Sequence, residues 1–161
     1  MMKEIHFEPL KGEERRERAD LDWVSEVVLL VDFVKSKLGQ KGVVESGEHL
    51  GSIEKLAWRN IIRRLSPAEF LARTFKGNYE PIGFKAQIYE DHEGVSALMV
   101  VKDCPYVSFW RKHMKDVGNL TEDDICSFCH ATFQWLSEFT FKYEGQRTRG
   151  RCGMTLSKEI E

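Results

Sequence analysis

Residues 84–102 read FKAQIYEDHEGVSALMVVK and contain the pattern that decides the fold. The first part of this stretch alternates apolar and polar side chains, as a strand with one buried face does. Turn-forming residues follow at Asp91–Gly94, and the chain then returns through residues 95–102. This order predicts a β-hairpin. The apolar run Ala97–Val101 also predicts that helices or a partner cover both faces of the second strand.

Two helical segments are predicted before the hairpin. Residues 21–38 place apolar side chains at helical spacing, and Gly39 follows as a helix stop. The stretch Gly39–Gly51 is polar and contains glycines, which predicts a connection. Apolar residues from Ile53 to Leu65 then mark the second helix. Because the apolar surface of the first helix is wide, we expect the sheet and a second subunit to cover it.

Capping signals predict two further helix starts. In Ser66-Pro67-Ala68-Glu69 the serine can cap and the proline suits a first turn, so a short helix should run to about Phe75. Thr121-Glu122-Asp123-Asp124 has a similar form and predicts a helix that holds two of the cysteines. Two final strands are predicted at about residues 140–147 and 151–156.

These elements predict an α+β fold, in which helices pack an antiparallel sheet of about four strands. The order is three helices, the hairpin, two helices and two strands, and the first of the later helices is Tyr106–Lys115. We expect a single domain over residues 1–161. It comprises a charged N-terminal arm (1–20), a helical half (21–78) and a sheet-and-helix half that carries the cysteines (79–161).

Composition and charge exclude several classes of partner. Lys and Arg number 24 against 26 for Asp and Glu, and this net charge of -2 gives no field that would attract nucleic acid. The longest apolar run, Val27–Val31, is too short to cross a membrane. The first residues, Met1–Pro9, lack the apolar core of a secretory signal, so we expect a cytoplasmic protein.

The string Cys126-Ser127-Phe128-Cys129-His130 has the form of a c-type haem attachment site. Covalent haem is attached outside the cytoplasm, so the absence of an export signal argues against it. The same expectation about the compartment disfavours structural disulfides. Neither haem nor disulfides therefore account for the four cysteines of the chain.

A metal site would use all four cysteines. Cys126 and Cys129 lie three residues apart on one face of the predicted helix, and Cys104 and Cys152 stand at the ends of predicted strands. If these strands converge on the helix, four thiolates suit zinc or iron. His130 can replace one of the thiols.

A reactive thiol and plain core packing compete with the metal site. A cysteine near a helix start can become reactive or redox-active, because backbone N–H groups stabilise the thiolate. The acidic residues Glu122–Asp124 before Cys126 oppose this, since their charge favours the neutral thiol. Alternatively, all four cysteines are small apolar residues of the core.

The block from about Tyr89 to Leu156 resembles a known family. The resemblance rests on a hairpin, on a Cys-Pro beside its second strand, on a helix with cysteine near its start, and on a final run that ends in Arg149-Gly150-Arg151-Cys152-Gly153-Met154. This order is similar to the vinyl-4-reductase (hydrocarbon-binding) domain and its relative, the L-2-amino-thiazoline-4-carboxylic acid hydrolase-like family. The resemblance covers under half of the chain.

The resemblance implies a dimer formed through helices and a pocket between helices and sheet for a small, largely apolar ligand. It carries the family's cysteine pattern onto Cys104, Cys126 and Cys152, with Cys129 as an addition. We therefore expect a ligand-binding and possible sensory domain with a cysteine-based metal or thiol site. The expected pocket walls are six aromatic residues: Trp58, Phe109, Trp110, Phe128, Phe133 and Trp135.

The alternative is an enzyme that hydrolyses a small cyclic amidine or amide. Cys126 would be the nucleophile and His130 the base, because residues four apart on a helix lie on one face. The related hydrolases carry an aspartate after the middle cysteine, whereas this chain has Cys129 and His130 nearby. This departure weakens the hydrolase interpretation.

Overall fold

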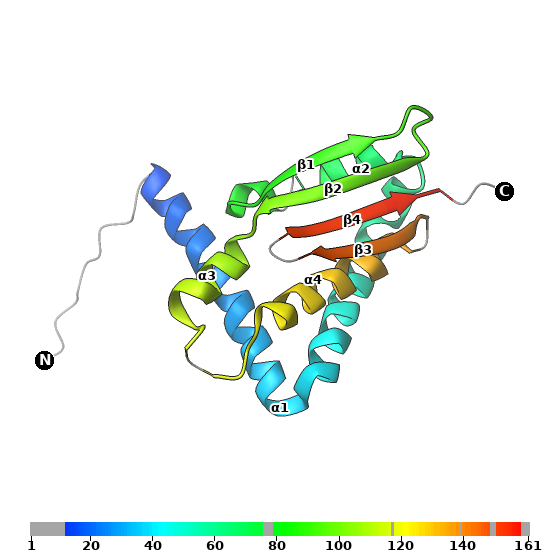
Figure 1. The fold of residues 1–161 in the computed structure, drawn as a ribbon. Helices are drawn as coiled ribbons and strands as arrows, with labels where there is room; N and C mark the ends of the chain where they lie inside the picture. Colours follow the sequence, from blue (N-terminus) through cyan, green and yellow to red (C-terminus); the bar gives the residue numbers. More distant parts are fainter. Residues whose placement is uncertain (1–11, 76–78, 117, 139, 149–150, 159–161) are drawn as a thin grey trace, which may run out of the picture.

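The structure is a computed structural model that describes residues 12–75, 79–116, 118–138, 140–148 and 151–158. It has the predicted α+β fold, with a helical N-terminal half and one four-stranded antiparallel sheet (Figure 1). The elements in chain order are α1 (Gly12–Ile62), α2 (Pro67–Thr74), the 3-10 turn η2 (Glu80–Ile82), β1 (Lys85–Glu90), β2 (Ser96–Asp103), α3 (Pro105–His113), α4 (Glu122–Ser137), β3 (Lys142–Thr148) and β4 (Arg151–Ser157).

The strands follow the order β1-β2-β4-β3 across the sheet. In β2, Ala97, Met99 and Val101 are buried, whereas Leu98 and Val100 are only half-buried. The alternation shows that one face of β2 packs on the core within the described part of the chain. The prediction that helices or a partner cover the other face as well stays a prediction, because Leu98 and Val100 there are half-buried in the single chain.

The largest difference from the predicted elements is in α1. Gly39 interrupts the helix with φ 70° and ψ −166°, so the predicted stop at this residue is confirmed. The helix resumes at once, however, and the predicted connection Gly39–Gly51 is wrong. Figure 1 shows α1 as two arms that meet in a V, which we call the first arm (residues 12–38) and the second arm (residues 40–62).

The glycines of the second arm serve packing rather than a loop. A Cβ added at Gly47 would lie 2.4 Å from the carbonyl oxygen of Phe128, and one at Gly51 would lie 2.4 Å from that of Thr132. Both oxygens belong to α4. The second arm and α4 therefore approach so closely that only a residue without a side chain fits at these two positions.

Both capping predictions are confirmed. The Ser66 hydroxyl accepts from the backbone N–H of Glu69, and the Glu69 carboxylate accepts from the backbone N–H of Ser66. Thr121 and Asp124 form the same reciprocal pair at the start of α4. The predicted end of α2 near Phe75 is also correct, although residues 76–78 lie outside the described part.

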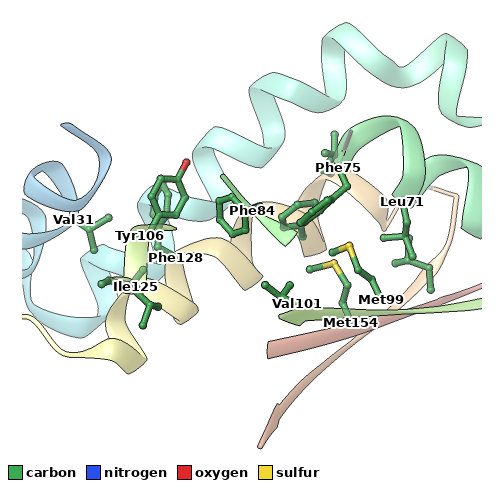
Figure 2. Close-up of a cluster of buried hydrophobic side chains, with 14 of the residues drawn as sticks. Val31, Leu71, Phe75, Phe84, Met99, Val101, Tyr106, Ile125, Phe128 and Met154 are labelled. Carbon is green, nitrogen blue, oxygen red and sulfur yellow. The ribbon is translucent and has the colours of Figure 1, made fainter. Parts of the chain in front are cut away.

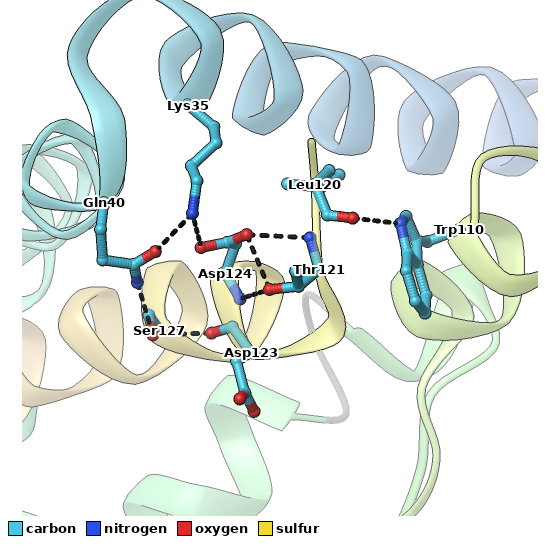
Figure 3. Close-up of polar contacts among 8 residues, drawn as sticks. All are labelled: Lys35, Gln40, Trp110, Leu120, Thr121, Asp123, Asp124 and Ser127. Atoms are coloured by element: carbon cyan, nitrogen blue, oxygen red, sulfur yellow. Dashed lines mark hydrogen bonds and ion pairs between the residues drawn. The ribbon is translucent and has the colours of Figure 1, made fainter. Parts of the chain in front are cut away.

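An ion pair joins the first arm of α1 to the cap of α4 (Figure 3). The Lys35 ammonium donates to Oδ1 of Asp124 at 2.7 Å and to the side-chain oxygen of Gln40 at 2.9 Å. The other carboxylate oxygen of Asp124 accepts from the backbone N–H and the hydroxyl of Thr121. Asp124 is 1% exposed, so its charge is compensated almost entirely by these partners.

Within the predicted charged arm at residues 1–20, residues 12–20 form the first turns of α1. Residues 1–11 lie outside the described part. The dimer expected through this helix stays a prediction, and the surface on which it would form is exposed. Large apolar side chains exposed on α1 are Leu21, Trp23, Leu29, Leu30, Phe33, Leu38, Leu50, Ile53, Leu56 and Ile61.

Among the described residues, no helix combines the length and the apolar character needed to span a membrane.

The close approach of the second arm to α4 predicts that Gly51→Ala destabilises the fold. Alanine is the better helix former by about 1 kcal/mol, but a clash in a packed interface costs about 1–3 kcal/mol. We expect urea unfolding to show a net loss of about 1–2 kcal/mol. The matched control is His49→Ala, an exposed position on the same arm, which should change stability by less than about 0.5 kcal/mol. A Gly51→Ala variant more stable than the wild type would contradict this packing.

The ion pair predicts a pH-dependent loss of stability. Burial alone would raise the pKa of Asp124, but hydrogen bonds from Lys35 and Thr121 lower it below the usual value of 3.8. A lowered pKa contributes stability above pH 3.8, and this contribution is lost as the pH falls through the lower pKa of the folded state.

In Asp124→Asn we expect a loss of about 3 kcal/mol at neutral pH, because the Lys35 ammonium keeps its burial and loses its counter-charge. Chemical unfolding from pH 7 to pH 2 should show a smaller acid-dependent loss in this variant than in the wild type. Asp123→Asn, an exposed neighbour, should cost less than about 1 kcal/mol. Equal costs in the two variants would show that the ion pair contributes little.

Candidate functional site

A cavity of about 600 Å³ lies between the inner face of the sheet and α4. Its floor comes from β2 and β4, where Val101 pairs with Cys152 and Met99 pairs with Met154. Directly opposed residues of antiparallel strands project to the same face, so these four side chains point together. Figure 2 shows Met99, Met154 and Val101 on the side of the strands that faces Phe75.

The cavity is apolar inside and polar at its rim. The apolar wall consists of Phe75, Tyr79, Phe84, Met99, Val101, Val107, Ile125, Phe133 and Met154. Charged and hydroxyl side chains follow at Lys102, Asp103, Ser108, Arg111, Thr121, Glu122 and Asp123. An ion pair crosses this rim, since Arg111 donates to the Glu122 carboxylate at 2.7 Å and so links α3 to α4.

All four cysteines line this one cavity. Cys126 and Cys129 come from α4, Cys104 is the residue before α3, and Cys152 comes from β4. Each is partly exposed rather than fully buried. The predicted convergence of the strand-end cysteines on the helix is therefore present in the structure.

Four cysteines that line one cavity do not by themselves form a metal site. Within the described ranges, no three side chains among His, Cys, Asp and Glu are placed so that they could hold one ion. A zinc ion needs sulfur ligands at about 2.3 Å in tetrahedral geometry. As they stand, the four thiols face a common space without forming that geometry.

Burial dominates the acidity of Cys104. It raises the pKa of this thiol to about 11 from 9.0, although the backbone N–H groups of Val107 and Tyr106 donate to the sulfur and act in the opposite direction. A thiolate at Cys126 or a carboxylate at Glu122 adds to the rise. Cys104 therefore remains a neutral thiol at physiological pH.

His130 extends from α4 to strands β3 and β4. Its Nε2 lies 3.4 Å from Sγ of Cys152, and its Nδ1 contacts the hydroxyl of Tyr143. The imidazole is 8% exposed. The structure places the Cys152 thiol against this imidazole, and the predicted pairing of His130 with Cys126 as base and nucleophile stays a prediction.

Of the five expected wall residues whose side chains the structure describes, Phe133 alone lines this cavity. The Phe109 ring packs against His113, and the Trp110 indole donates to the Leu120 carbonyl. Phe128 is buried in the core, and Trp135 is 39% exposed beside Lys55. The side chain of Trp58 lies outside the described part. Aromatic residues at helical spacing on these helices serve helix packing and the surface instead.

The aromatic residues that do line the cavity come from a segment without a strong sequence signal. Phe75, Tyr79 and Phe84 lie around η2 and pack against one another and against Phe133. Burial raises the pKa of Tyr79 well above its usual value. The floor residues had a usable signal, since Met99, Val101 and Met154 occupy inward positions of the strands.

The half-buried side chain of Glu54 acts electrostatically on Tyr79. Burial raises the pKa of Glu54, and its Oε2 has no hydrogen-bond partner among the described residues. A carboxylate at this position in turn disfavours the ionised forms of Tyr79 and Tyr106. Both phenols therefore remain neutral, and Tyr79 presents a neutral ring to the cavity.

Comparison with known proteins leaves the fold and the cavity as the basis for function. No family model matches the sequence, and no curated protein is similar enough to count as a relative. The likeness to the vinyl-4-reductase domain and the thiazoline hydrolases therefore stays a resemblance.

The raised pKa of Cys104 predicts an unusual pH dependence of its alkylation. Only the thiolate reacts with iodoacetamide, so a pKa of about 11 should make the rate at pH 10 about 90-fold higher than at pH 8. The same cysteine in unfolded protein should show about a tenfold rise, as its ordinary pKa of 9.0 predicts. Peptide mapping of the labelled protein measures both ratios, and access to the thiol cancels within each ratio. A tenfold rise in the folded protein would rule out the raised pKa.

Proposed function

We propose that this cavity binds a small, largely apolar molecule, with cysteine thiols against the ligand. The observation that carries the proposal is that four cysteines from three parts of the chain line one cavity of about 600 Å³. The volume falls in the range of small-molecule sites, about 300–1,000 Å³. An apolar interior with polar groups at the rim is the usual arrangement of such sites.

Burial supports a binding role over pure packing. A cysteine that only fills the core is fully buried, whereas all four here are partly exposed toward a common space. The neighbouring core positions Leu71, Ile125 and Leu156 are nearly inaccessible, at 2% exposure or less. The space is therefore bounded by a packed core, as expected of a site that opens beside it.

In the proposed function the cysteines act as thiols without a bound metal ion. Zinc or iron at Cys104, Cys126, Cys129 and Cys152 would require the side chains to move together, since no three of the described ligand types now meet at one point. A zinc titration followed by elemental analysis tests this form separately. One tightly held ion per chain, lost in Cys126→Ser, would favour the metal form over thiols without a metal.

The second candidate is the hydrolase, and the contact between Cys152 and His130 favours it. A thiol beside an imidazole that a third group orients is the arrangement of a cysteine nucleophile. In this form the nucleophile is Cys152 in place of Cys126. Turnover of a cyclic amidine by the wild type, and its loss in Cys152→Ser, would favour the enzyme over the binding domain.

Filling the cavity should abolish binding of an apolar probe. Val101→Phe places a larger side chain on the cavity floor, and we expect it to weaken binding of the dye N-phenyl-1-naphthylamine at least about tenfold. Dye fluorescence measures the affinity, and thermal unfolding confirms that the variant is folded.

The matched control is Val100→Phe, the next residue of β2, which points to the opposite face of the sheet. We expect it to bind the dye as the wild type does. If Val101→Phe does not fold, Ser108→Trp at the rim replaces it, with Lys112→Trp on the same helix as its control. Saturable binding that is equal in the variants and their controls would contradict the proposed site.

A further inference from the structure

The four cysteines that line the cavity differ in their surroundings. Cys152 lies 3.4 Å from a ring nitrogen of His130, and the other ring nitrogen contacts the hydroxyl of Tyr143. These groups come from β4, α4 and β3, so the tertiary fold assembles them. Cys104 is instead held as a neutral thiol by burial, which raises its pKa.

The backbone leaves a space for the imidazole. A Cβ at Gly145 would lie 2.7 Å from Nδ1 and 3.1 Å from Cε1 of His130, and 3.1 Å from the Tyr143 hydroxyl. Gly145 is opposite Met154 in the sheet, and Tyr143 is opposite Leu156. Because Met154 lines the cavity, the missing side chain at Gly145 lets the ring lie on β3 directly beside the cavity floor.

We propose that Cys152 is the nucleophile of the cavity, that His130 is its base, and that the pair captures a small apolar α,β-unsaturated carbonyl compound as a thioether. The inference rests on the proposed function, since the electrophile must first occupy the apolar cavity. Tyr143 is a positioning residue that acts through His130. Cys152 lines the cavity, whereas the buried imidazole is not among the groups that line it.

The step balances without an oxidant or a reductant. With the proton of the neutral imidazole on Nδ1, where Tyr143 can accept it, the Nε2 lone pair takes the proton of the Cys152 thiol. The thiolate attacks the β-carbon of the ligand, a C–S bond forms, and the C=C π bond breaks to leave an enolate. The proton on Nε2 then passes to the α-carbon, which regenerates neutral His130 and leaves the saturated ketone bound to sulfur.

The surroundings suit this class of ligand. A thiolate is a soft nucleophile, and the cavity floor offers the thioether side chains of Met99 and Met154 and the apolar surface of Val101 to an alkyl chain. An apolar cavity disfavours a free thiolate, so a base in contact with the sulfur is needed for the reaction to proceed. The structure places the imidazole of His130 against the Cys152 thiol.

The test uses oct-1-en-3-one as the electrophile and octan-3-one as its unreactive analogue, both with the full chain. Intact-protein mass spectrometry measures the rate of adduct formation, and peptide mapping locates the adduct. Displacement of N-phenyl-1-naphthylamine by octan-3-one measures binding without reaction. We expect the adduct on Cys152 before any other cysteine, and its absence from that peptide in Cys152→Ser, which still binds octan-3-one.

Variants of His130 and its neighbours distinguish an effect on the reaction rate from an effect on ligand binding. His130→Gln should slow adduct formation at least about tenfold while the affinity for octan-3-one stays within about twofold, because the imidazole acts on the proton and not on the ligand. Tyr143→Phe should slow the reaction less, and Gly145→Ala should slow it by displacing the ring. The matched controls are His113→Gln and Tyr89→Phe, at exposed positions outside the cavity.

Equal rates of adduct formation on Cys126, Cys129 and Cys152 would overturn the inference, as would an unchanged rate in His130→Gln. Both results leave the proposed binding function intact if octan-3-one still displaces the dye. A wild-type protein that binds neither the dye nor octan-3-one would instead overturn the proposed function, and the inference with it.

Discussion

Two carbonyl oxygens of α4 lie too close to α1 for a side chain at Gly47 or Gly51. At Gly47 and Gly51 the second arm of α1 approaches α4 so closely that a methyl group would lie 2.4 Å from the carbonyl oxygens of Phe128 and Thr132. Packed interiors do not yield easily to such a contact, so it determines the distance and the rotation of α4 relative to α1. The ion pair between Lys35 and Asp124 joins the first arm of α1 to the first turn of α4. It therefore also fixes how far α4 is shifted along its own axis relative to α1.

This placement determines what α4 offers to the sheet. With Phe128 and Thr132 against α1, the helix turns Cys126, Cys129 and Phe133 to the cavity. His130 points past the edge of the cavity to β3 and β4. The pairing of β2 with β4 then brings Cys152 and Met154 into line with Val101 and Met99 under the helix. The positions of the cysteines and methionines around the cavity are thus determined by the packing of α4 on α1 and by the register of β2 and β4.

Local signals in the sequence predicted the local structure well. The capping boxes at Ser66 and Thr121, the break at Gly39 and the hairpin depend on a few neighbouring residues, and all are present. The polar stretch after Gly39 was misread because glycine is equally suited to a loop and to a close helix contact. Which of the two applies depends on α4, which lies about 80 residues further along the chain.

The site could be predicted only in part for the same reason. That the cysteines would meet was inferred from strand ends and one helix face, and the cavity that they share agrees with it. The contact of Cys152 with His130 could not be inferred, since β4 is brought to α4 only by the tertiary fold, whereas spacing along α4 draws attention to Cys126. The aromatic lining around η2 has no periodic pattern, so composition rules pointed to the helices instead.

The apolar surroundings of the cavity favour ligand binding but disfavour ionisation of its thiols. An apolar surround binds apolar ligands well, but it raises the pKa of a thiol, as burial does at Cys104. A thiol that is to react in such a place needs a proton acceptor within contact distance, and that acceptor must itself be protected from solvent to remain oriented. His130 meets both conditions at Cys152, because β3 contributes a hydroxyl on one side of the ring and a glycine beneath it. The apolar character that favours binding therefore also makes the reactivity of Cys152 depend on the base beside it.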